Sequence, residues 1–169
     1  MKAFGLSLIA FAAVSSALAW QTEKRRYIRR MRDLAQFLSL MQGELATYGL
    51  PLPELLETLI PRVPESVGCF AQSLLQALPL LASAGFSSLW KRCAATSFPD
   101  AGAMEKSVLE TVGQTLGRYD LPRQCQVLEE SATLLQKEAE SQEQALHRNC
   151  GLAWGLALTA GAMLAIVLV

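Results

Sequence analysis

One stretch of the sequence decides the fold class: residues 27–48, which read YIRRMRDLAQFLSLMQGELATY. Its apolar residues recur at intervals of four and three positions, and they are Tyr27, Met31, Leu34, Leu38, Met41, Leu45 and Tyr48. This period places one apolar stripe along an α-helix. Gly49 follows, where a left-handed residue commonly ends a helix. The stretch therefore predicts a helix of about 25 residues with one buried face.

Helical periodicity continues after this stretch, and residues 23–149 contain no alternating strand pattern with hairpin turns. Prolines and glycines divide the rest into expected helices at residues 53–60, 65–78, 87–96, 103–116 and 121–149. The last has Asp120 as its N-cap and Pro122 in its first turn, and no breaker follows until Gly151. The sequence therefore predicts an all-α fold, an antiparallel bundle of about six helices.

Many apolar residues lie at the two ends of the chain, which has 169 residues and is 51% hydrophobic and 18% charged. That composition excludes disorder of the whole chain. No charged residue occurs in residues 3–22 or in residues 149–169. Each run is about 20 residues, the length that crosses the hydrocarbon core of a bilayer as a helix. The sequence therefore predicts two transmembrane helices, at 3–22 and 149–169, that flank a helical domain at 23–148.

A cluster of basic residues follows the first apolar run. It consists of Lys24, Arg25, Arg26, Arg29, Arg30 and Arg32, which we call the basic collar. Basic residues beside a membrane span stay in the cytoplasm, so the collar predicts a cytoplasmic middle domain with both termini on the other side. It also suits contact with anionic membrane lipids. The alternative is a cleaved secretory signal that ends at Ala19 and leaves a mature chain beginning at Trp20.

Small residues recur along the second apolar run. One stripe has Ala153, Ala157, Gly161 and Ala165 at a spacing of four, and Gly151 and Gly155 form a GxxxG pattern beside it. Small residues allow close approach of helices in lipid. We expect this stripe to pack on another membrane helix, although alanine and glycine are also common in membrane helices that make no such contact.

The middle domain is acidic, because residues 34–146 contain seven basic and thirteen acidic side chains, a net charge of −6. The whole chain is neutral, which argues against a general nucleic-acid binder. The acidic side chains form either a solvated surface or a dock for a basic partner. Two groups of candidate partner contacts stand out: a turn stiffened by proline, with Leu50, Pro51, Pro53 and Glu54, and acidic residues of the last helix, Glu129, Glu130, Glu138 and Glu140.

Residues that carry catalytic chemistry are few. The single histidine, His147, has no cysteine or carboxylate at a metal-ligand spacing, and the four cysteines form no CxxC pair. Cys69 and Cys125 are expected to be small core residues. The chain has no Walker loop, no GxSxG and no GxGxxG. We therefore expect no catalytic residues, no metal, no cofactor and no enzyme activity.

The order of segments resembles the stage III sporulation protein AB family of endospore-forming bacteria. The likeness rests on four segments in sequence order: a short apolar run followed by RRxxR (residues 25–29), YGLPLPE (48–54), LGRYD (116–120) with Gln124 four positions on, and GLAWG (151–155) after a long helix. The resemblance implies two anchors around a six-helix domain similar to the cytoplasmic domain of type II secretion and type IV pilus platform proteins.

The resemblance also implies a role in the channel complex that links mother cell and forespore. The expected partners are a secretion-type ATPase, stage III sporulation protein AA, and other channel subunits, with a homo-oligomer as a further possibility. The expected location is the cell membrane, with the middle domain on the mother-cell side of the outer forespore membrane.

Three functions remain open at this point. The first is a non-enzymatic platform or adaptor that docks the ATPase to membrane channel components. The second is a membrane-anchored sensor with a helical domain that binds a small ligand in a pocket between helices. The third is an exported protein with a cleaved signal and a tail anchor.

Overall fold

A computed structural model describes the backbone of residues 2–80, 85–116 and 118–168, and the side chains of Ser15 and of residues 19–79, 85–116 and 118–148. The chain divides into two compact units. The first comprises residues 1–28 and 139–169, and the second, which we call the head, comprises residues 29–138.

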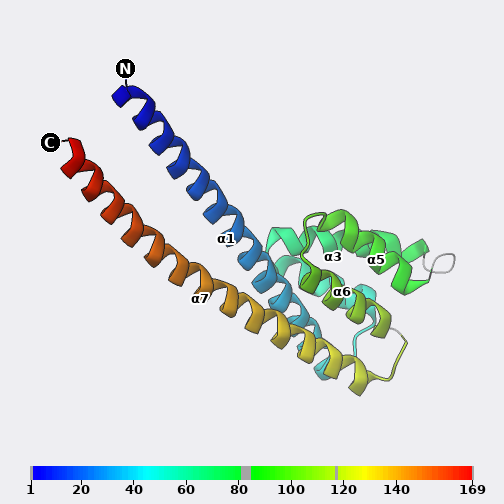
Figure 1. Ribbon diagram of the computed structural model, residues 1–169. Coiled ribbons are helices and arrows are strands. Elements are labelled where there is room, and N and C mark those ends of the chain that lie inside the picture. Colours follow the sequence, from blue (N-terminus) through cyan, green and yellow to red (C-terminus); the bar gives the residue numbers. More distant parts are fainter. Residues whose placement is uncertain (1, 81–84, 117, 169) are drawn as a thin grey trace. The chain divides into compact units, whose positions relative to one another are not determined.

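The described part of the chain is helical throughout and contains no strand (Figure 1). Its elements are α1 (Lys2–Tyr48), α2 (Leu52–Leu59), the 3-10 turn η1 (Ile60–Arg62), α3 (Glu65–Ala77), η2 (Leu78–Leu80), α5 (Phe86–Ser97), α6 (Ala103–Thr115) and α7 (Leu121–Leu168). The predicted all-α fold is confirmed. Helix α7 extends beyond the expected end at residue 149 and runs through Gly151 without a break.

Glycine and proline end the helices of the head as the sequence predicts. Gly49 has a φ of 59°, and its N–H donates to the Leu45 carbonyl at 3.0 Å, which closes the last turn of α1. Pro51 is the N-cap of α2, and Pro64 is the N-cap of α3. Because proline lacks an N–H and disfavours helical backbone in the residue before it, these positions start new helices and do not continue old ones.

The core of the head is built around Phe70 on α3. Its ring meets Phe37 of α1 and Trp90 of α5 edge to face, with centroids 6.1 Å and 5.0 Å apart, and it meets Phe98 at 5.4 Å. Helix α3 packs against both α2 and α5, and α5 packs against α6. The stripe that opened the sequence analysis supplies one wall, since Met31, Leu34, Leu38 and Met41 are fully buried.

The predicted membrane spans fall almost wholly on residues whose side chains lie outside the described part. Among the residues that the structure does describe, no helix contains an apolar stretch long enough to span a bilayer. Residues 3–22 are helical but are not a separate element, because α1 runs as one helix of 47 residues through the apolar run, the basic collar and the stripe.

Candidate functional site

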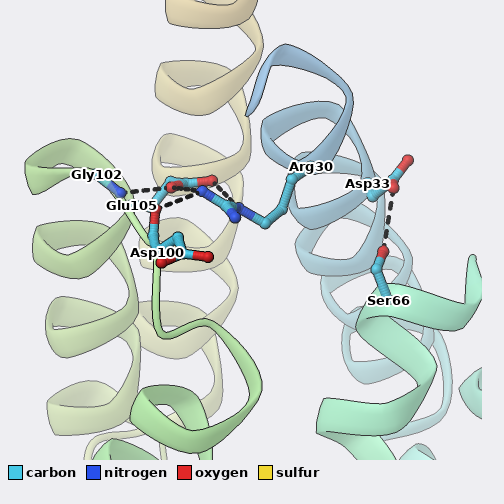
Figure 2. A network of polar contacts seen from close by, with 6 residues as sticks. All are labelled: Arg30, Asp33, Ser66, Asp100, Gly102 and Glu105. Atoms are coloured by element: carbon cyan, nitrogen blue, oxygen red, sulfur yellow. Dashed lines mark hydrogen bonds and ion pairs between the residues drawn. The ribbon is translucent and has the colours of Figure 1, made fainter. Parts of the chain in front are cut away.

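An ion pair joins α1 to the start of α6 in the head (Figure 2). Arg30 donates from Nε to Glu105 Oε1 at 2.9 Å and from Nη2 to Oε2 at 3.0 Å. The Glu105 side chain is fully buried, whereas the Arg30 side chain is 22% exposed. A bidentate pair of this kind is among the stronger polar contacts in proteins, and it specifies geometry as well as energy.

The same ion pair holds the segment that connects α5 to α6. Arg30 Nη2 also donates to the carbonyl oxygen of Asp100 at 2.8 Å, and the N–H of Gly102 donates to Glu105 Oε2 at 2.7 Å. Gly102 is the N-cap of α6, so Glu105 accepts one of the N–H groups that a helix start leaves without an intrahelical partner. Both ends of the short segment 100–102 are therefore fixed.

An apolar pocket lies between α5 and α6 next to this segment. Its floor consists of buried residues, namely Trp90, Ala94, Phe98, Ala101 and Leu109, and its volume is about 250 Å³. Three of the residues that line it are alanines, 94, 95 and 101, whose short side chains leave the space open. The pocket is apolar where it is deep and polar only at its rim.

Three charged residues form the rim of the pocket. Lys91 of α5 pairs with Glu110 of α6, with Nζ 3.3 Å from Oε1, and both side chains are exposed. Lys106 completes the rim from α6. It has no ion-pair or hydrogen-bond partner among the described residues, and the adjacent Glu105 is already bound to Arg30. The rim therefore carries a net positive charge.

Comparison with known proteins identifies the family. The family model of stage III sporulation protein AB matches residues 2–169. The chain belongs to this family. A solved structure titled stage III sporulation protein AB matches with a TM-score of 0.61 and 21% sequence identity, over 70% of this chain and 94% of that one. At that identity the likeness shows the fold alone. A comparison with curated protein sequences gives no match.

Within this member of the stage III sporulation protein AB family, the basic collar is not uniform. Arg25, Arg26, Arg29 and Arg32 are exposed, and Lys24 lies with Nζ 5.8 Å from the centroid of the Tyr27 ring. Arg30 differs, because it is the residue that binds Glu105 in the head. The charge of Arg30 is therefore paired within the head, and the role of the collar as a lipid contact stays a prediction.

Of residues 50–54, Leu50 and Pro51 lie between α1 and α2, and residues 52–54 form the start of α2. Leu50 and Leu52 pack against the core, whereas Pro51, Pro53 and Glu54 are exposed. The role of these residues as partner contacts stays a prediction.

The four glutamates predicted as one acidic group do not share one face of α7. Glu129, Glu130 and Glu140 are exposed, but Glu138 is only half-exposed. Glu138 comes nine residues after Glu129, which is about two and a half turns and places it on the opposite side of the helix. Glu129 and Glu130 remain the exposed acidic residues of α7 within the head.

The small residues predicted to pack in the membrane lie outside the residues with described side chains. They are Gly151, Ala153, Gly155, Ala157, Gly161 and Ala165, and their backbone belongs to α7. Their packing stays a prediction.

The cysteines are distributed differently from the expectation. Cys69 is exposed on α3, so its prediction as a core residue is wrong, whereas Cys125 is half-buried and packs against the core. Cys93 is buried, and burial raises the pKa of its thiol. Within the described ranges, no three His, Cys, Asp or Glu side chains lie close enough together to hold a metal ion.

The Arg30–Glu105 pair was not predicted, although the sequence carries one signal for it. Glu105 stands in the inward stripe of α6, at the spacing of four and three that continues through Leu109, Val112 and Leu116. A single carboxylate in an apolar stripe predicts a buried charge with a cationic partner. It does not say which of the basic residues that partner is.

Proposed function

We propose that this chain is a non-enzymatic, membrane-anchored adaptor that docks a cytoplasmic ATPase to membrane channel components during endospore formation. The family match over residues 2–169 carries the proposal, because it connects this helical chain to stage III of sporulation. The ATPase is stage III sporulation protein AA, and the complex is the channel between mother cell and forespore.

Membrane anchoring is supported by the distribution of charge. The two runs without charged residues, 3–22 and 149–169, are each long enough to span a bilayer, and the first is followed at once by basic residues. Three exposed arginines of the collar, Arg25, Arg26 and Arg29, precede or flank Arg30 and can face anionic headgroups. Each basic residue near such a surface contributes about 1 kcal/mol of attraction.

An adaptor role is supported by the way polar groups are used in the head. Every buried side-chain nitrogen or oxygen in the described part has a hydrogen-bond partner. Among the described residues, the one fully buried carboxylate is that of Glu105, and it is bound by Arg30 and by the N–H of Gly102, which is a structural arrangement. Catalytic sites instead hold polar groups ready for a substrate.

The sensor alternative requires a pocket with several convergent polar groups. The pocket between α5 and α6 has a buried apolar floor, and its charged residues stand only at the rim. Its volume of about 250 Å³ is also below the range of about 300–1,000 Å³ that is typical of small-molecule sites. The pocket between α5 and α6 therefore does not favour the sensor.

Two measurements test the proposal with the full-length chain. After expression in an endospore former, the chain is expected to stay in the membrane fraction through an alkaline wash, and a protease-accessibility assay is expected to show the head in the cytoplasm. The purified chain in mild detergent is expected to retain the ATPase. A head on the far side of the membrane, or a chain that retains neither the ATPase nor any channel subunit, contradicts the proposal.

A topology test must leave Arg30 unchanged. Changing all the arginines of the collar to glutamate would break the contact with Glu105 as well as remove the membrane signal. The variant Arg25→Glu, Arg26→Glu and Arg29→Glu alters exposed residues only. It is expected to invert or scramble the orientation, which a reporter fused near residue 120 detects, while the fold of the head is kept.

A further inference from the structure

The pocket between α5 and α6 has a floor that cannot collapse. The Trp90 indole N–H donates to the Leu109 carbonyl at 2.7 Å, and the ring also meets Phe70 edge to face. The same ring lies directly over Gly113, where a Cβ atom would be 2.3 Å from Trp90 Cδ1. Since Trp90 is locked on these sides, the pocket exists before any partner arrives, and little ordering is needed on binding.

The size of the pocket indicates the kind of group it takes. About 250 Å³ is too small for a typical small-molecule site, and the deep part offers no polar partner. An apolar pocket of this kind suits one large aliphatic or aromatic side chain from a protein segment, as in the anchoring of an amphipathic helix on a groove. Such buried anchors dominate the energetics of protein interfaces.

The charge of the rim indicates which residues flank the apolar side chain that a partner inserts. Glu110 neutralises Lys91, and Arg30 occupies Glu105, so the positive charge of Lys106 is left without an acidic partner among the described residues. A segment with carboxylates beside its apolar anchor is complementary to this rim, whereas a basic segment is repelled.

From these observations we infer that the pocket between α5 and α6 is the docking point for the ATPase, which inserts one large apolar side chain flanked by carboxylates. This inference rests on the proposed function, because only that function supplies a cytoplasmic partner. The pocket lies wholly in the head, which the proposed function places in the cytoplasm.

Two variants of the pocket and two matched controls test the inference. Ala95→Trp fills the pocket from an exposed position on α5, and Lys106→Glu reverses the charge of the rim. The controls make the same kinds of change elsewhere on the head, with Gln36→Trp on α1 and Lys137→Glu on α7, both at exposed positions. All four full-length proteins are first compared with the parent by circular dichroism and thermal unfolding.

The affinity of each protein for purified stage III sporulation protein AA is then measured in mild detergent. We expect Ala95→Trp to weaken binding by about tenfold or more, as the loss of an anchor does. Lys106→Glu is expected to weaken it by about threefold to tenfold, with a smaller effect as salt is raised. Both controls are expected to bind within about twofold of the parent.

Three outcomes would overturn the inference. If the parent binds the ATPase and the pocket variants bind like the controls, the docking point is elsewhere and the proposed function stands. If the pocket variants change only self-association, measured by analytical ultracentrifugation of the same samples, the occupant is a second copy of the chain. If the parent does not bind the ATPase at all, the proposed function fails together with the inference.

Discussion

Removing Arg30 is expected to destabilise the head more than removing Glu105, although Glu105 is the more deeply buried residue. In Arg30→Ala the carboxylate of Glu105 stays buried and keeps only the N–H of Gly102 as a partner. In Glu105→Ala the guanidinium of Arg30 keeps the Asp100 carbonyl and is already 22% exposed, so water can solvate it. The loss of stability therefore depends on how well the remaining partner is solvated, and not on how deeply the removed residue was buried.

The magnitudes follow from this difference. Breaking a buried ion pair from one side costs about 3–5 kcal/mol. We expect about 3 kcal/mol for Arg30→Ala, the low end, because the pair lies near the surface. For Glu105→Ala we expect about 2 kcal/mol, of which about 1 kcal/mol is the lost contact at the N-cap. The double variant is expected to cost about as much as Glu105→Ala alone, which gives a coupling free energy of about 3 kcal/mol.

Urea unfolding of the full-length chain in mild detergent measures these free energies. Replacing Trp20 and Trp154 with phenylalanine leaves Trp90 as a fluorescent probe inside the head. With a slope of about 2 kcal/mol per molar urea, Arg30→Ala shifts the midpoint by about 1.5 M. Arg29→Ala is the matched control, because it removes an exposed arginine of the same helix, and it is expected to leave the midpoint unchanged.

Two results would refute this reasoning. One is a larger loss of stability for Glu105→Ala than for Arg30→Ala, which would mean that the cap and not the ion pair dominates. The other is an additive double variant, with a coupling free energy near zero, which would mean that the contact in Figure 2 contributes nothing beyond its separate parts.

The remaining predictions concern glycines and cysteines. Gly113→Ala is expected to lower the stability by about 1–3 kcal/mol and to change the near-UV circular dichroism, because the new methyl group displaces Trp90. Gly43→Ala is expected to raise the stability by up to about 1 kcal/mol, because a Cβ atom at this position in α1 would have no neighbour within 4 Å. A loss of stability in Gly43→Ala would contradict the expected difference between the two glycines. Cys69 is expected to react with iodoacetamide in the native state, and mass spectrometry measures the rate of labelling. Cys93 is expected to react only on unfolding, because burial both covers the thiol and raises its pKa, so that labelling of Cys93 at the native rate of Cys69 would contradict its burial.

Much of the fold of the head was predictable because local and global signals agree there. The apolar stripe on α1, Gly49 after it and the prolines at 51 and 64 each act within a few residues, and all of them mark helix boundaries that the structure confirms. What the pattern did not indicate is that α1 has no break near residue 22. Charges end an apolar run, but they do not end a helix, since lysine, arginine and glutamate are good helix formers.

The pocket and its ion pair were not predictable because they depend on contacts between distant segments. Arg30 and Glu105 are 75 residues apart, and the chain offers Glu105 many basic residues as possible partners. The pocket likewise depends on how α5 and α6 approach each other, where the alanines at 94, 95 and 101 leave space that larger residues would fill. In the sequence alone, those alanines cannot be distinguished from ordinary helix residues.

The ion pair and the pocket belong to one structural arrangement, and this affects how variants of either must be interpreted. Ala101 lines the pocket, and it lies between the Asp100 carbonyl and the Gly102 N–H, both of which the Arg30–Glu105 pair holds. Loss of Arg30 therefore loosens one wall of the pocket even in molecules that stay folded. A sporulation defect in an Arg30 variant thus cannot be assigned to the proposed membrane contact of the basic collar, whereas the exposed Arg29 has no part in the ion pair and its variant tests that contact separately.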